Sequence, residues 1–219
     1  MKQQQQPYFR DRTHAGQQLI SPLAAFAQPA NTIVLGLPRG GVPVAYEIAH
    51  ALSLPLDICL VRKLGVPDHK ELAMGAIALG GRRILNQQLI SELAISEQVV
   101  DQITAQEYQE LKRRERAYRG EKPRLDLQGR TVILVDDGIA TGASIQVAVM
   151  IVRSQQPQQI IVAVPVAPAP TCQALAAKVD QVVCLSMPDP FHAIGLWYDN
   201  FSQTTDAQVR DLLARQSSP

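Results

Sequence analysis

The residues best suited to chemistry are two adjacent carboxylates followed by a turn of small and hydroxyl-bearing residues. Asp136 and Asp137 come first, and the candidate anion-binding residues after them are Gly138, Ala140, Thr141, Gly142, Ala143 and Ser144. Small residues let main-chain N–H groups converge, and a helix N-terminus adds positive partial charge, so this turn suits a phosphate. The carboxylates would repel that phosphate but suit a Mg²⁺ ion or the hydroxyls of a ribose beside it. The stretch predicts a site for a phosphorylated sugar; the alternative is an ordinary strand-to-helix turn with a solvated acid pair.

A second turn of the same kind lies earlier in the chain. Pro38, Arg39, Gly40 and Gly41 follow the apolar run 32–37 and precede a predicted helix over 42–52. Consecutive glycines let an anion approach the main chain closely, and Arg39 adds a bidentate phosphate donor. Alone, this pattern is also that of a plain turn. Beside the first turn, it predicts a second phosphate-binding loop.

Together the two turns resemble the type I phosphoribosyltransferases. The motif VDDGIATGAS resembles that family's motif for phosphoribosyl pyrophosphate (PRPP), and PRGG resembles its pyrophosphate loop. Together with VRKLG and FxxxGxWY, these motifs are similar to one branch of the family over most of the chain.

The resemblance assigns roles to these residues. It implies that Asp136 and Asp137 hold the ribose hydroxyls, and Mg²⁺ indirectly through PRPP, while the turn after them holds the 5′-phosphate. It implies that Arg39 and the two glycines bind the pyrophosphate. The implied reaction transfers ribose 5-phosphate to a nitrogen acceptor, an unidentified purine or pyrimidine-like base, and releases pyrophosphate.

Further candidates lie between the two turns. Arg62 and Lys63 follow a predicted buried strand, and by resemblance Lys63 contacts phosphate; two solvated cations are the alternative. Residues 65–85 correspond by resemblance to a flexible lid that closes over PRPP and excludes water. His69 and Glu71 are the candidates for acid or base chemistry from this lid. Ala140 stands where some 6-oxopurine-using relatives carry an acid, which argues against a 6-oxopurine acceptor and means that any general base comes from elsewhere. The alternative for His69 is a solvated loop histidine.

Three other stretches have two interpretations each. The predicted C-terminal cap, 188–219, concentrates aromatic residues, and Phe191, Trp197 and Tyr198 could stack on a base or pack the tail onto the core. The basic stretch 112–124 is expected at a solvated helix end, with a nucleic-acid patch or a subunit contact as alternatives. Residues 10–12, two arginines and an aspartate, are expected to be solvated.

Apolar runs alternate with helical patterns, which predicts an α/β fold. The runs are 32–37, 56–61, 131–135, 159–166 and 181–187, and helices are expected over 9–27 and 86–119. The resemblance implies a three-layer, doubly wound, mainly parallel sheet in the order 3-2-1-4-5-6, with the third strand, near 74–79, antiparallel. We expect one domain over 1–219 with a disordered tail over 1–8. The first and fourth strands would then be neighbours at a switch point, where a ligand crevice opens.

Composition sets limits on partners and compartment. The chain has 219 residues, a net charge of +1 and 46% hydrophobic residues, which predicts one soluble domain without nucleic-acid or membrane binding. No apolar run approaches the roughly 20 residues of a membrane helix. Three cysteines without a CxxC pair favour structural thiols in a reducing cytoplasm. The resemblance implies a homodimer.

Two other functions fit parts of the sequence. A non-catalytic regulator could use the same fold to sense PRPP or a nucleotide. A receiver-type signalling domain also carries an acidic pair after an apolar strand. In such a domain, however, the pair lies near the start, and PRGG would be unexplained.

Overall fold

The computed structural model describes residues 9–28, 30–120 and 125–216, apart from the side chains of Lys70 and Glu71. The tail predicted over 1–8 and the end of the basic stretch, 121–124, lie outside the described residues.

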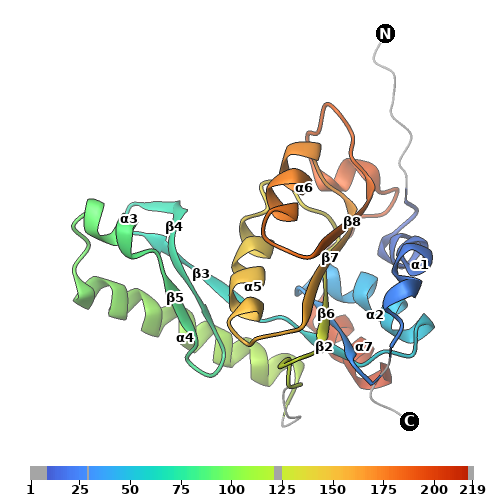
Figure 1. Ribbon diagram of the computed structural model, residues 1–219, viewed down its shortest axis with the longest axis horizontal. Helices are drawn as coiled ribbons and strands as arrows, with labels where there is room; N and C mark the ends of the chain where they lie inside the picture. The colour runs from blue at the N-terminus through green and yellow to red at the C-terminus, as the bar shows by residue number, and fades with distance from the viewer. Residues whose placement is uncertain (1–8, 29, 121–124, 217–219) are drawn as a thin grey trace.

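A five-stranded parallel sheet forms the centre of the molecule (Figure 1). Its order is β2-β1-β6-β7-β8, and neighbouring strands pair in parallel. The strands are β1 (Thr32–Gly36), β2 (Leu56–Ile58), β6 (Thr131–Val135), β7 (Gln159–Val166) and β8 (Gln181–Ser186). β1 and β6 are buried along their whole length, as expected of unbroken apolar runs covered on both faces. The arrangement confirms the α/β class and the predicted order 2-1-4-5-6.

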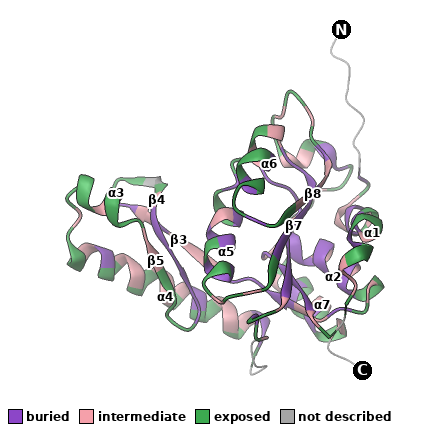
Figure 2. Cartoon of the chain, in the orientation of Figure 1, coloured by how far each residue is buried: buried purple, intermediate pink, exposed green. Residues whose placement is uncertain are grey.

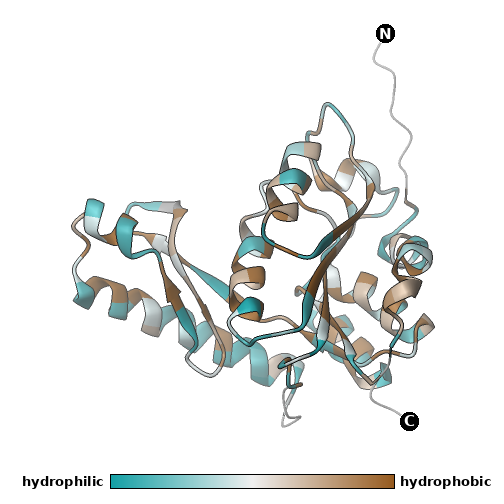
Figure 3. Cartoon of the chain, viewed as in Figure 1, coloured by the Kyte–Doolittle hydropathy of each residue, from teal (hydrophilic) through white to brown (hydrophobic). Residues whose placement is uncertain are grey.

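Helices cover both faces of this sheet. Helices α1 (Arg12–Leu23) and α2 (Gly41–Ala51) lie on one face, and α5 (Ala143–Arg153) and α6 (Ala169–Ala176) lie on the other. Alternate residues of β6 pack against the helices on the two faces, because successive side chains of a strand point to opposite faces. Val132 and Leu134 pack toward α5 and α6, and Ile133 and Val135 toward α1 and α2. The strands of this sheet are accordingly mostly buried in Figure 2 and mostly hydrophobic in Figure 3. The predicted three layers are confirmed.

A second, antiparallel sheet and two helices form a side lobe over residues 61–118, at the left of Figure 1. The sheet contains β3 (Val61–Val66), β4 (His69–Ala78) and β5 (Arg83–Leu85), and α3 (Gln87–Glu92) and α4 (Glu97–Tyr118) follow. The predicted helical pattern over 86–119 is interrupted near Ala94, whose φ is 49°. Asn86 and Ser96 cap the two helices that result. The remaining elements are η1 (Ala24–Phe26), η2 (Ile194–Trp197) and α7 (Asp206–Gln216).

The predicted place of the third strand is wrong. Residues 74–78 belong to β4, which pairs with β3 on one edge and β5 on the other. Its main-chain groups are therefore satisfied inside the side lobe instead of at the edge of the main sheet. The run 56–61 also divides, so that Arg62 and Lys63 lie inside β3 and not after a core strand. Most of 65–85 is strand, and the lid motion stays a prediction.

A buried ion pair fastens the side lobe to the main sheet. Arg119, which follows α4, donates from Nη2 to Oδ1 of Asp57 in β2 at 2.7 Å and from Nε at 3.2 Å. The Arg119 side chain is 6% exposed and also pairs with Glu115 at 3.1 Å. The same Asp57 oxygen accepts the N–H of Ile58 at 2.7 Å. These contacts set the position of α4 relative to the strand ends.

Replacing this arginine should destabilise the protein strongly. Arg119→Met leaves the Asp57 charge buried without its cation, and we expect a loss of about 3–5 kcal/mol in the free energy of unfolding. Urea unfolding followed by circular dichroism measures it. The control is Arg113→Met on the exposed face of α4, where the pair with Glu110 is solvated and no measurable loss is expected. Equal effects from the two variants would contradict the anchoring role.

Candidate functional site

The loop after β6 forms a cradle at the start of α5. Gly142, at the N-cap of α5, has a left-handed φ of 78°, which favours glycine. The Ala143 N–H donates to the Thr141 hydroxyl at 3.5 Å. Residues 136–145, together with Ile194, line a cavity of about 230 Å³. Every residue predicted to bind the 5′-phosphate therefore lies around one hollow at a helix N-terminus, a position that favours an anion.

The PRGG loop lies directly beside this cradle. β1 and β6 are neighbours in register, Gly36 opposite Val135, so the loops that follow them meet. A Cβ added to Gly40 would lie 1.9 Å from Oδ2 of Asp137, and one on Gly41 would lie 2.6 Å from the Val135 carbonyl oxygen. Only glycine fits these contacts. Because α2 and α5 leave to opposite faces, the loops stand at the predicted switch point.

The two carboxylates have different surroundings. Asp137 is 9% exposed, and its Oδ2 accepts from Nε of Arg12 at 2.7 Å. Its carbonyl oxygen accepts the Tyr198 hydroxyl at 2.6 Å, and burial raises the pKa of that tyrosine. Asp136 is half-buried and accepts the Asp137 N–H at 2.9 Å. Burial first, and the charge of Asp137 second, raise the pKa of Asp136 well above its usual range.

Arg39 is held loosely at the edge of the site. Its Nη1 lies 3.6 Å from Oδ1 of Asp206, with the two side chains 37% and 40% exposed. The same Asp206 oxygen accepts the Tyr118 hydroxyl at 2.9 Å. An exposed pair at this distance is weak, so an anionic ligand could compete for Arg39.

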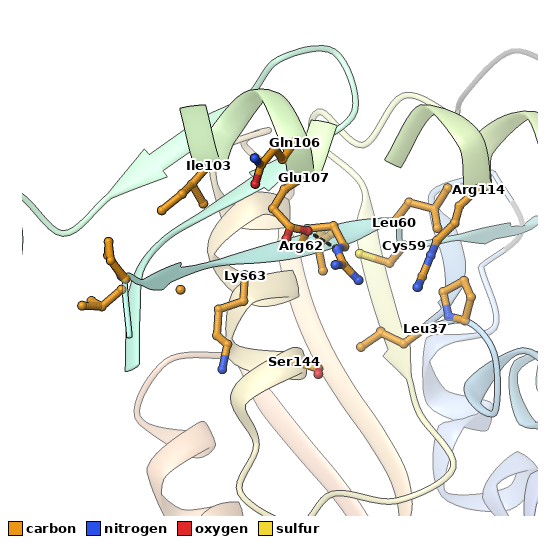
Figure 4. Close-up of a pocket in the computed structure, with 15 residues that line it drawn as sticks. Leu37, Cys59, Leu60, Arg62, Lys63, Ile103, Gln106, Glu107, Arg114 and Ser144 are labelled. Atoms are coloured by element: carbon orange, nitrogen blue, oxygen red, sulfur yellow. Dashed lines mark hydrogen bonds and ion pairs between the residues drawn. The ribbon is translucent and has the colours of Figure 1, made fainter. Parts of the chain in front are cut away.

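A larger cavity of about 510 Å³ (Figure 4) lies next to the cradle. Ser144 lines both cavities. Its walls come from Leu37 and Pro38 on one side and from β3 and α4 of the side lobe on the other. Its charged lining residues are Arg62, Lys63, Arg114 and Glu107. Arg62 pairs with Glu107, and Arg114 pairs with Glu110 at 2.8 Å. Three of the four charged lining residues are basic.

Several predicted residues lie away from these two cavities. His69 is exposed at the start of β4, and the side chain of Glu71 is outside the described part. Phe191, Trp197 and Tyr198 line neither cavity. Trp197 and Tyr198 are buried with Phe9, and Phe191 packs against that cluster. The structure therefore places the aromatic residues where they pack the tail onto the core.

The sequence missed the role of Arg12, which was expected to be solvated. Its side chain is 12% exposed and contacts Asp137, which lies 125 positions away in the chain. It also missed the contribution of α4, which lines the larger cavity with Ile103, Gln106, Glu107 and Arg114. No local pattern marks either set.

The protein itself offers few side-chain ligands for a metal ion. Within the described ranges, no group of three or more His, Cys, Asp and Glu side chains is placed to hold a metal ion. The Asp136–Asp137 pair supplies carboxylate oxygens, the ligand type that Mg²⁺ prefers. A Mg²⁺ ion held here would draw further oxygen ligands from a bound phosphate compound.

Among the helices that the structure describes, none has the length and apolar character needed to cross a bilayer.

The contact between the two loops can be tested by a double-mutant cycle. Gly40→Ala should cost about 1–3 kcal/mol of unfolding free energy, because the new Cβ collides with the Asp137 carboxylate. In an Asp137→Ala background the same change should cost much less, since the colliding atoms are gone. Urea unfolding of the four proteins measures the coupling. Equal costs in both backgrounds would show that the loops do not touch.

The raised pKa of Asp136 predicts how stability depends on pH. The neutral carboxyl favours the folded state below the usual Asp range, and this contribution is lost as the pH rises through the raised pKa. Asp136→Asn should therefore be more stable than the wild type at about pH 8 and lose this advantage near pH 4. Urea unfolding in buffer without divalent cations measures the difference. A pH-independent difference would contradict the shift.

Comparison with known proteins agrees with these features. A family model for the phosphoribosyl transferase domain matches residues 12–196. A protein of Mycobacterium tuberculosis (strain ATCC 25618 / H37Rv), named a candidate phosphoribosyl transferase, is 43% identical over 207 residues. That match covers 94% of this chain and 46% of the mycobacterial protein, so the chain spans about half the length of the curated relatives it matches.

A solved structure is similar over nearly all of the chain. The crystal structure of the protein TT1426 from Thermus thermophilus superimposes with a TM-score of 0.86 at 40% identity, covering 96% of this chain and 99% of that one. The family match spans both loops, the acid pair and the side lobe. The chain therefore belongs to the phosphoribosyl transferase domain family.

Proposed function

We propose that the protein is a phosphoribosyltransferase that uses PRPP and Mg²⁺ to transfer ribose 5-phosphate to a nitrogen acceptor, releasing pyrophosphate. One observation carries the proposal: two loops suited to anions meet at an acid pair, with Gly40 against Asp137. PRPP carries phosphate at both ends of a ribose and fits such a pair of loops. The family's use of PRPP as co-substrate supports the same conclusion.

The proposed roles follow the positions of the residues. The cradle after β6 binds the 5′-phosphate, Asp136 and Asp137 accept from the ribose hydroxyls, and Arg39 with the Gly40 and Gly41 amides binds the pyrophosphate. Lys63 lines the larger cavity and adds positive charge beside the leaving group. When bound, Mg²⁺ supplies charge neutralisation to the pyrophosphate. The chain's own contribution is positioning and electrostatic stabilisation of an oxocarbenium-like ribose.

The acceptor belongs in the larger cavity, next to the cradle. A nitrogen nucleophile placed there would approach the anomeric carbon from the side lobe. Closure of residues 65–85 over the site would exclude water and bring His69 and Glu71 nearer. We place the protein in the cytoplasm as a homodimer, and the free thiols of Cys59, Cys172 and Cys184 support a reducing compartment.

Binding of PRPP tests the site. Isothermal titration with Mg²⁺ and PRPP should give saturable binding, and Arg39→Ala and Thr141→Val should each weaken it about tenfold by removing one donor to a phosphate. Arg113→Met, on the exposed face of α4, serves as the matched control and should leave binding unchanged. If PRPP binds the wild type and both loop variants alike, the assignment of the two loops is wrong.

Turnover separates the enzyme from the alternative, a non-catalytic sensor of PRPP. Pyrophosphate release should be measured with a panel of purine and pyrimidine-like bases. An enzyme releases pyrophosphate with at least one acceptor, whereas a sensor binds PRPP and releases none.

A further inference from the structure

We propose that Arg12 is a positioning residue that fixes the carboxylate of Asp137 for its ribose contact. The C-terminal segment 198–202 in turn holds Arg12. This role presupposes the proposed function, and it assigns part of the site to the first helix and to the tail of the chain.

The Arg12 guanidinium is restrained on three sides. Its Nε donates to Oδ2 of Asp137 at 2.7 Å, and its Nη1 donates to the Ser202 carbonyl oxygen at 2.7 Å. Its Cζ lies 4.0 Å from the centroid of the Phe201 ring. The ring contact and the Nη1 hydrogen bond together fix the plane of the guanidinium, and with it the direction of the Nε–H bond. That bond points to Asp137.

Asp137 is also held at its main chain. The Tyr198 hydroxyl donates to its carbonyl oxygen at 2.6 Å, and the Tyr198 ring lies 4.9 Å from that of Phe201. Oδ2, the oxygen that accepts from Arg12, occupies the space over Gly40. With Oδ2 committed in this way, Oδ1 is presented to a ribose hydroxyl in one orientation. Preorganisation of this kind strengthens binding because less freedom is lost when the ligand arrives.

The charge of Arg12 has a second effect. Asp136 and Asp137 are adjacent, and two neighbouring carboxylates repel each other. A guanidinium within hydrogen-bond distance of one of them offsets this repulsion. The two carboxylates can then stay close together before a sugar phosphate and a metal ion bind.

The same contact would also fit a competing role for Arg12. In that role the guanidinium would occupy Asp137 and would have to be displaced by the ligand. The two roles differ in sign. A competitor that is removed makes PRPP bind more tightly, whereas a positioning residue that is removed makes PRPP bind more weakly.

The test is a double-mutant cycle on the dissociation constant of PRPP, measured by calorimetry with Mg²⁺. Arg12→Gln should weaken binding about tenfold, as expected for loss of a hydrogen bond to a charged group. In the Asp137→Asn background the same substitution should add less than twofold, because Arg12 acts through Asp137. Arg12→Lys should recover part of the affinity, since it keeps the charge without the planar fork. The neighbouring, exposed Arg10→Gln is the control and should change nothing.

Three results would overturn this role: unchanged or tighter binding in Arg12→Gln, full additivity with Asp137→Asn, or no recovery in Arg12→Lys. Thermal melting checks that each variant is folded. If Arg12→Gln does not fold, Arg12→Lys and Phe201→Leu replace it, and each should weaken binding severalfold. If the wild type binds no PRPP, the proposed function and this role are both refuted. If the wild type binds PRPP and the Arg12 variants bind it equally well, this role alone is refuted.

Discussion

The site depends on the close approach of two backbone segments that follow neighbouring parallel strands. β1 and β6 pair in register, and the loop after each turns toward the other. The approach leaves no room for a side chain at Gly40, where the Asp137 carboxylate lies. α2 and α5 then leave to opposite faces of the sheet, which is the arrangement of a switch point. The two loops therefore lie side by side at the acid pair, at the carboxyl ends of the central strands.

Both ends of the chain contribute to that cleft. Phe9 packs in the cluster with Trp197 and Tyr198, and its N–H donates to the Trp197 carbonyl oxygen at 3.0 Å. This contact brings α1 and the C-terminal segment together behind the acid pair. Arg12 reaches Asp137 from one end of the chain, while Asp206, at the other end, lies beside Arg39. The C-terminal segment is thus part of the site's support.

The side lobe supplies the remaining wall. Its antiparallel sheet is fastened to the core at Asp57 through Arg119, so α4 keeps a defined position over the strand ends. The larger cavity lies between this lobe and the PRGG loop, and its charged residues come from β3 and α4. The two loops suited to anions belong to the core, whereas the charged lining of the larger cavity belongs to the lobe. Under the proposed function, the binding of the sugar phosphate and the choice of acceptor would then depend on different parts of the chain.

The sequence by itself determined the features that depend on residues close together in the chain. Unbroken apolar runs predicted the buried strands. The order of acid pair, small turn and helix start predicted the cradle around Gly142, and Arg39-Gly40-Gly41 predicted the second loop. These predictions concern local backbone conformation and burial, which neighbouring residues largely set.

Only the tertiary structure decided which distant residues meet. An apolar stretch such as 74–78 can pair at any free strand edge, and the choice fell to β3 and β5 because the hairpin makes them the nearer partners. Likewise, an arginine near the start of a helix has the same local signature whether it points to water or to an acid. Arg12 contacts Asp137 across 125 positions because α1 packs beside the strand ends and the tail covers it. Such contacts depend on the packing of whole elements, and no local pattern encodes them.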